Sequence, residues 1–165
     1  MRRITLLRHA KSDWGNPALS DFDRPLNQRG KRNLKLMGER LQNNGVRPSL
    51  VISSNAVRAI TTARAIAEAI GYPVEFIQRE PDLYLASPRT ILDIISREGT
   101  GYNDLMIVGH NPGLTELANM ICTTPIDNLP TCAAYAVDID IDDWLDLATT
   151  QGSLNYFEYP KKKHA

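Results

Sequence analysis

The chain has 165 residues, of which 42% are hydrophobic and 23% are charged, and its 19 Lys and Arg residues balance 19 Asp and Glu residues. This length is enough for one substantial core and too short for two ordinary domains. A formal net charge of zero gives no indication of a general affinity for nucleic acids or membranes, so neither is an expected partner.

Short apolar runs alternate with amphipathic segments along the first half of the chain. Residues 4–7 form a β-prone run that stops at polar residues, which is typical of a buried parallel strand. Asn27 is suited to cap a helix, and Gly45 and Gly71 are suited to end helices. The predicted elements are, in order, a strand at 4–7, a loop at 10–26, a helix between Asn27 and Gly45, a strand at 49–53, a helix at 56–70 and a strand at 74–77.

The second half of the chain continues the alternation and then ends in strands. Capping residues precede a proline at two places, an order that opens a helix. The predicted elements are a helix opened by Ser87-Pro88, a strand at 105–108, a helix opened by Asn111-Pro112, and strands at 133–139 and 153–159 that bracket an acidic stretch. Because right-handed crossovers place helices on both sides of a parallel sheet, the sequence predicts an α/β fold. We expect a three-layer α/β/α sandwich with a mostly parallel sheet in a single compact domain.

Neither a targeting segment nor a disulfide framework is indicated. The apolar run that starts at Ile4 ends before Arg8, which is far short of the apolar region of a signal peptide, and no run approaches membrane-spanning length. Cys122 and Cys132 are isolated and have no CxxC spacing, which suits free thiols in a reducing compartment. We therefore expect a cytoplasmic protein.

Polar side chains follow three of the predicted strands. His9 and His110 come directly after buried strands, and Arg58 lies in the first turn of the helix that follows another strand. Ligands of parallel sheets bind beyond the carboxyl ends of the strands, so these side chains and Arg8 are expected to meet in one crevice.

The chemistry of this crevice favours a phosphate over a metal ion. Guanidinium groups repel a divalent cation, whereas they hold phosphate oxygens with paired, charge-assisted hydrogen bonds. Arg8 and Arg58 also disfavour a proton on His9, and only the neutral ring has a nucleophilic lone pair. The sequence therefore predicts phosphoryl chemistry at His9 with fixed cations in place of a metal, and with no cofactor.

Four segments of the chain resemble signatures of the histidine phosphatase superfamily. Residues 7–12 (Leu-Arg-His-Ala-Lys-Ser) resemble its Arg-His-Gly signature, although Ala10 replaces the usual glycine. Residues 54–63 resemble its Ser-x-x-x-Arg-Ala-x-x-Thr-Ala segment, and residues 109–112 match its second-histidine segment. Residues 23–30 resemble its Pro-Leu-[Thr/Ser]-x-x-Gly element. The short length and the Arg-Pro-Leu element are most similar to the SixA-type branch, whose members include protein-phosphohistidine phosphatases.

The resemblance implies a phosphoglycerate mutase-like fold and a set of site residues. It implies that His9 is the nucleophile, that Arg8 and Arg58 bind the phosphate, and that His110 stabilises the transition state. We expect the histidine phosphatase domain to cover residues 1–160, with a basic C-terminal tail at 161–165.

The family's proton donor lies in a segment that here contains two carboxylates, Glu80 and Asp82, and either could serve. A donor has to be protonated near neutral pH, which requires burial to raise its pKa. The alternative is that both are solvated loop carboxylates.

Three further polar residues are candidates for contact with the substrate. Ser12 and Asn111 could each bind a phosphate oxygen or only cap a neighbouring segment. Arg24 could be a third phosphate ligand or could form an ion pair with Asp21 or Asp23.

These residues predict a metal-independent phosphatase that forms a phosphohistidine intermediate at His9, and the resemblance to the SixA-type branch implies that it removes phosphate from phosphohistidine in a protein. One alternative is a phosphatase of small phosphorylated metabolites with the same pocket. Another is a phosphate-binding module without catalysis. The sequence leaves the natural substrate and the oligomeric state open.

Overall fold

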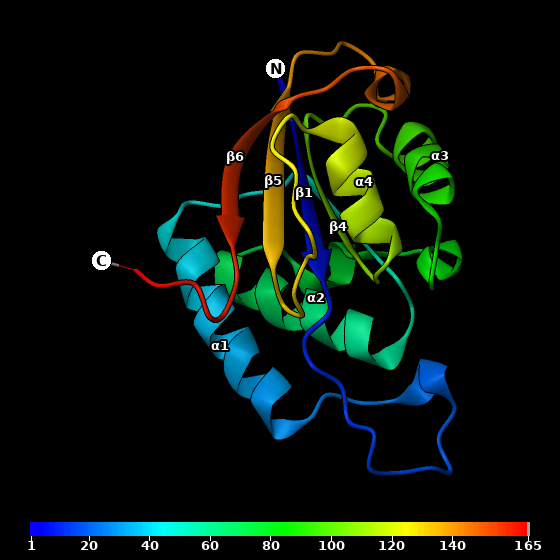
Figure 1. Ribbon diagram of the computed structural model, residues 1–165, viewed down its shortest axis with the longest axis vertical. Helices are drawn as coiled ribbons and strands as arrows, with labels where there is room; N and C mark the ends of the chain where they lie inside the picture. The colour runs from blue at the N-terminus through cyan, green and yellow to red at the C-terminus, as the bar shows by residue number, and fades with distance from the viewer. Residues whose placement is uncertain (165) are drawn as a thin grey trace.

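The computed structural model describes residues 1–164, which form a six-stranded sheet between two layers of helices (Figure 1). The strand order is β3-β2-β4-β1-β5-β6, in which the first four strands are parallel and β5 is antiparallel to both of its neighbours. The strands are β1 (Arg2–Arg8), β2 (Leu50–Ser53), β3 (Gln78–Arg79), β4 (Asp104–Gly109), β5 (Ala134–Ile139) and β6 (Ser153–Glu158). The predicted three-layer α/β fold is confirmed.

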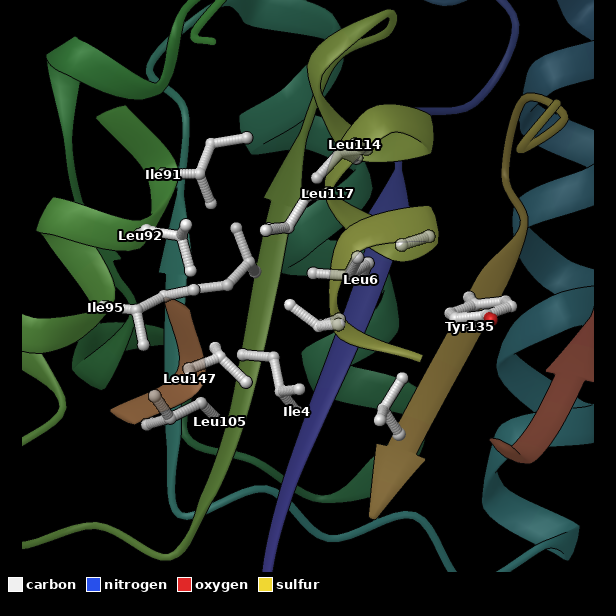
Figure 2. Packing of buried hydrophobic residues seen from close by; sticks show 14 of the residues in the cluster. Ile4, Leu6, Ile91, Leu92, Ile95, Leu105, Leu114, Leu117, Tyr135 and Leu147 are labelled. Carbon is white, nitrogen blue, oxygen red and sulfur yellow. The ribbon is translucent and has the colours of Figure 1, made fainter. Parts of the chain in front are cut away.

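Alternation along the strands divides the core between the two faces of the sheet. The helices are α1 (Gln28–Asn43), α2 (Val57–Ile70), α3 (Pro88–Glu98) and α4 (Gly113–Ile121). Leu7 of β1 faces α1 and α2, where it belongs to a buried cluster with Met37 and Ile66. Ile4 and Leu6 face α3 and α4, where Figure 2 shows them among apolar side chains of both helices. The two apolar clusters thus cover the two faces of the sheet, and the ends of its strands lie at the edges of these layers.

Local capping explains where the helices begin and end. The Asn27 side chain accepts the Gly30 N–H at 2.7 Å and opens α1, and Ser87 accepts the Thr90 N–H at 3.2 Å and opens α3. Gly71 ends α2 in the left-handed conformation, with a φ of 79°. These boundaries agree with the sequence prediction.

The prediction of a strand at 74–77 is wrong. Val74–Phe76 forms a 3₁₀ turn, and the strand that follows contains only Gln78 and Arg79. The Phe76 N–H bonds to Pro73 O at 3.0 Å, so the backbone is satisfied locally rather than by a ladder. Phe76 is 65% exposed, and burial therefore gives its apolar side chain no reason to pair with the sheet edge.

The direction of β5 separates the two ends of the molecule. Ile139, at the end of β5, pairs with Arg2 at the start of β1, so the acidic stretch at 138–146 lies opposite to His9. The described part of the predicted basic tail, residues 161–164, follows β6, and residue 165 lies outside the described residues. Within residues 1–164, no helix is both long and apolar enough to cross a membrane.

Candidate active site

A pocket of about 460 Å³ opens beyond the carboxyl ends of β1 and β4. It brings together seven residues that the sequence predicts for the site, namely Arg8, His9, Ser12, Arg24, Arg58, His110 and Asn111. The His9 and His110 rings lie at the centre, with their centroids 5.2 Å apart. Its other lining residues are Lys11, Trp14, Asp21, Leu85 and Thr131.

His9 is held in one tautomer by the backbone. Its Nδ1 lies 2.7 Å from Ala10 O, and because a carbonyl only accepts, Nδ1 carries the proton. Nε2 is then left with a free lone pair. Burial lowers the His9 pKa to about 4, with smaller contributions from the positive charges of Arg58 and Arg8. The ring is therefore neutral and nucleophilic at physiological pH.

The low pKa of His9 has a measurable consequence. Because the pKa lies at about 4, protonation removes the Nε2 lone pair only below that pH. We expect kcat/KM for p-nitrophenyl phosphate, corrected for ionisation of the substrate, to decline toward acid with an apparent pKa near 4. A decline centred near 6.5, the ordinary value for histidine, would contradict the buried environment of His9.

His110 is buried behind His9 and is also neutral. Its Nε2 lies 2.8 Å from Ser54 Oγ, and its Nδ1 is buried without a partner among the described residues. Burial, then the proximity of His9 and Arg58, lowers the His110 pKa to about 3. When the Ser54 hydroxyl donates to Nε2, Nδ1 carries the ring proton and remains a hydrogen-bond donor without a partner in residues 1–164.

Arg8 and Arg58 supply the fixed positive charge of the pocket. Both have a buried Nε without a hydrogen-bond partner in residues 1–164, and Arg58 is only 3% exposed. Arg8 is held by a 3.1 Å bond from Nη1 to Leu129 O, and burial beside Arg58 lowers its pKa from the usual value. Unsatisfied buried donors of this kind are costly, and anions are the ligands that guanidinium donors bind most strongly.

The Asp21 carboxylate is hydrogen-bonded to two of the pocket arginines, Arg24 and Arg58. Arg58 donates from Nη1 to Asp21 O at 2.7 Å and from Nη2 to Asp21 Oδ2 at 3.0 Å, and Arg24 Nη2 lies 3.1 Å from Asp21 Oδ1. Tyr84 also donates its hydroxyl to Asp21 Oδ2. This hydrogen bond, together with those from Arg58 and Arg24, lowers the Asp21 pKa to about 2. The carboxylate is therefore ionised and takes donors that a phosphate would need.

Asp21→Asn is expected to tighten phosphate binding. The amide has no charge to compete for Arg58 and Arg24, so Kd for inorganic phosphate or tungstate should fall about three- to tenfold. Isothermal titration measures this. The control is Asp23→Asn in the same 3₁₀ turn, because the Asp23 side chain bonds only to Ser20 Oγ within the described residues. Unchanged or weaker binding by Asp21→Asn would show that the carboxylate does not compete with the anion.

A threonine of α2 fixes the backbone beside His9. Thr62 Oγ1 accepts the Ala10 N–H at 2.9 Å and donates to Arg58 O at 2.8 Å. This bond links the His9 loop to the helix that carries Arg58. Ala10 is fully buried and does not have a positive φ, so the position does not require the glycine usual in the family.

The three candidate substrate contacts line the pocket in different ways. Arg24 is 7% exposed, stacks over Trp14 at 3.4 Å from the ring centroid and pairs with Asp21, so it fits both alternatives drawn from the sequence. Ser12 is buried at the pocket wall. Asn111 mainly organises structure: its Oδ1 accepts the Thr115 N–H at 3.2 Å, and its Nδ2 donates to Leu129 O at 3.0 Å.

The structure does not bring Glu80 or Asp82 to the pocket. Neither lines it, and Glu80 Oε2 forms an ion pair with Arg97 at 3.0 Å. Asp21 is the one carboxylate among the pocket-lining residues in the described part of the chain. From the sequence, Asp21 is expected only as an ion-pair partner of Arg24. The available signal was its position three residues before Arg24 in the Arg-Pro-Leu element.

Two neutral imidazoles and three guanidinium groups line one pocket and can hold and transfer a phosphoryl group, so fold and pocket together define a class of phosphoryl-transfer enzymes. A family model of the histidine phosphatase superfamily (branch 1) matches residues 4–83. An uncharacterised protein of Arabidopsis thaliana, described as chloroplastic, is 30% identical over 159 residues, covering 92% of this chain and 72% of its own. The chain belongs to the histidine phosphatase superfamily and to its SixA-type branch, and it is a phosphatase.

Solved structures share the whole fold. SixA from Agrobacterium tumefaciens, a protein with a proposed phosphohistidine phosphatase activity, is 30% identical with a TM-score of 0.80, covering 96% of this chain and 98% of its own. A mycobacterial glucosyl-3-phosphoglycerate phosphatase is 15% identical with a TM-score of 0.67, covering 94% of this chain and 98% of its own. The same architecture therefore occurs in phosphatases named for different substrates.

Proposed function

We propose that this phosphatase removes phosphate from phosphohistidine in a protein by way of a phosphohistidine intermediate at His9. The observation that carries the proposal is the bond from His9 Nδ1 to Ala10 O, which leaves a neutral Nε2 in a pocket lined by arginines. A histidine in that state is a nucleophile, and the arginines favour the phosphoryl group as its electrophile.

The first step is an in-line attack by His9 on phosphorus. The Nε2 lone pair forms the new P–N bond while the bond from phosphorus to the leaving imidazole nitrogen breaks. Arg8, Arg58 and His110 stabilise charge on the equatorial oxygens throughout. Water then attacks phospho-His9: its oxygen bonds to phosphorus while the P–Nε2 bond breaks, the proton that it loses passes to the Asp21 carboxylate, and inorganic phosphate and the neutral ring are released.

The leaving nitrogen needs a proton, and in this proposal Asp21 carries it. In the free enzyme the Asp21 pKa is about 2 because Tyr84, Arg58 and Arg24 stabilise the carboxylate. When the phosphoryl oxygens take over Arg58 and Arg24, Asp21 loses those partners and faces a negative group instead. Both changes raise its pKa while the Tyr84 hydrogen bond remains, and the proposal requires that Asp21 takes up a proton in the complex. An imidazole leaves more readily than an alkoxide, so a weak acid at this position suits a phosphohistidine substrate.

The mouth of the pocket favours a protein substrate. Trp14 is 77% exposed and Leu85 is 54% exposed, although both line the pocket. Large apolar side chains at an open mouth suit contact with another protein surface, where they would be covered. A pocket for a small metabolite would more commonly enclose most of its ligand.

A substrate panel tests the proposal. We expect kcat/KM for a phosphohistidine peptide to exceed that for sugar phosphates and nucleotides by about 100-fold or more, because the imidazole leaving group and the open mouth both favour it. Initial rates of phosphate release measure the difference. A higher kcat/KM for a sugar phosphate or nucleotide than for every phosphohistidine peptide would instead identify a phosphatase of small metabolites.

A further inference from the structure

A second pocket, of about 410 Å³, adjoins the phosphate pocket, and the two share Lys11 and Thr131. Its remaining walls come from the first turns of α1, the loop before β5 and the chain after β6. We call it the basic groove, and its residues besides the two shared ones are Arg29, Asn33, Pro130, Tyr159, Pro160 and Lys161. The activity proposed above makes no use of it.

The wall after β6 is fixed by hydrogen bonds to its backbone. Arg40 Nη1 donates from α1 to Tyr159 O at 2.8 Å and to Pro160 O at 3.3 Å. Lys162 Nζ donates to Phe157 O at 2.7 Å, and the Phe157 and Tyr159 rings pack with their centroids 4.9 Å apart. The segment that carries Lys161 is thereby held against α1 and forms one fixed wall of the groove.

The wall at Lys11 is fixed by a close approach of α1. The Asn27 N–H donates to Lys11 O at 3.0 Å, and a Cβ added to Gly30 would lie 2.2 Å from the same oxygen. Only glycine therefore allows the first turn of α1 to pack against the loop after β1. Lys11 lines both the phosphate pocket and the groove, and Arg29 lines the groove.

The groove carries positive charge without a countercharge. Lys11, Arg29 and Lys161 are exposed, none forms an ion pair within residues 1–164, and no carboxylate lines the groove. The acidic stretch at 138–146 lies at the opposite end of the sheet, beyond β5 in Figure 1. The basic groove and the acidic stretch therefore lie at opposite ends of a chain whose formal net charge is zero.

We propose that the basic groove docks an acidic segment of a phosphorylated protein substrate while its phosphohistidine occupies the adjoining pocket. This inference rests on the proposed function. Lys11 would meet the part of the substrate nearest the phosphoryl group, and Arg29 and Lys161 would pair with carboxylates farther along.

The layout of the groove favours an extended acidic chain over a second phosphate. In the phosphate pocket Arg24 and Arg58 converge on the carboxylate of Asp21, which has the size of a single anionic group. In the groove the three cations come from three separate segments, and apolar surface of Pro130, Tyr159 and Pro160 lies among them. Carboxylates spaced along a peptide, with backbone and side-chain carbon between them, match that pattern.

The test compares two charge reversals on the same protein. Arg29→Glu with Lys161→Glu changes the groove and leaves the phosphate pocket intact, because neither residue lines that pocket. Lys31→Glu with Lys35→Glu makes the same change in net charge on the face of α1 that adjoins α2. The substrates are two phosphohistidine peptides that differ only in glutamate or glutamine flanking residues, with p-nitrophenyl phosphate as the small reference.

For the wild type we expect the glutamate peptide to have a KM about tenfold lower than the glutamine peptide at low ionic strength. The groove variant should lose this preference through KM and keep its kcat/KM for p-nitrophenyl phosphate. The control variant should keep the preference. Equal KM values for the two peptides in the wild type, or an equal loss in the control variant, would overturn the groove as a docking site.

A binding measurement separates the groove from the proposed function. Fluorescence anisotropy with a labelled, unphosphorylated peptide containing four glutamates should show binding to the wild type and a Kd about tenfold higher for the groove variant. If this holds while no phosphohistidine peptide is hydrolysed, the groove stands and the proposed activity fails. If phosphohistidine peptides are hydrolysed but the Kd is unchanged in the groove variant, the docking proposal alone fails.

Discussion

His9→Ala is expected to lower kcat by about 10⁴-fold or more while the protein stays folded, because the reaction then has no nucleophile. The loss should be similar for p-nitrophenyl phosphate and for a phosphohistidine peptide, since both pass through the same intermediate. His9 lies after the end of β1, and within residues 1–164 its side chain hydrogen-bonds only to Ala10 O, so the sheet does not depend on it. Initial rates measure the loss of kcat. Circular dichroism and thermal unfolding show whether the variant stays folded.

The matched control is His164→Ala, because the chain has only three histidines and His164 lies in the tail beside Glu158. This variant should keep wild-type turnover. Acid-labile, base-stable phosphate incorporated on rapid quenching should be present in the wild type and absent from His9→Ala. Turnover by His9→Ala within about tenfold of the wild type would exclude His9 as the phosphoryl acceptor.

The parts of the fold with local causes could be predicted from the sequence. Asn27 and Ser87 cap their helices through the N–H groups of residues three positions later, so the signal lies within four consecutive residues. His9 and His110 could be placed together because parallel strands end at the same edge of a sheet. The strand prediction at 74–77 was wrong because an apolar composition does not show whether a neighbouring strand covers the segment.

The parts of the site that depend on loops could not be predicted. Asp21 meets Arg58 from 37 positions away and Tyr84 from 63 positions away, and nothing periodic in residues 10–26 indicates where that loop folds. Glu80 was a reasonable donor by its position in the chain, but the sequence does not show that Arg97, on α3, pairs with its carboxylate. In loops, tertiary contacts decide where the side chains lie. Such contacts join residues far apart in the chain and leave no periodic pattern in the sequence.

Arg58 replacements are expected to have the second largest effect. Arg58→Ala removes a buried guanidinium group that would bind the phosphoryl oxygens, so kcat/KM should fall about 10³-fold, which corresponds to about 4 kcal/mol of transition-state stabilisation. Arg58→Lys keeps the charge but lacks the two-pronged geometry of the guanidinium group, and it should recover only part of the loss. Rates with p-nitrophenyl phosphate measure both variants. The control is Arg64→Ala, because Arg64 is exposed on the same helix and does not line the pocket.

The pH profile of the Arg58 variants distinguishes electrostatic stabilisation from a structural role. The positive charge of Arg58 contributes to lowering the pKa values of both His9 and His110. Removing that charge makes protonation of His9 easier, so the acid decline of kcat/KM should move to higher pH in Arg58→Ala and stay near its wild-type position in Arg58→Lys. A stability loss alone would lower the amount of active enzyme equally at each pH and leave the profile in place. An unshifted profile in Arg58→Ala would therefore show that Arg58 does not act on His9 through its charge, and that the buried side chain serves mainly to hold Asp21 and the loop that carries it.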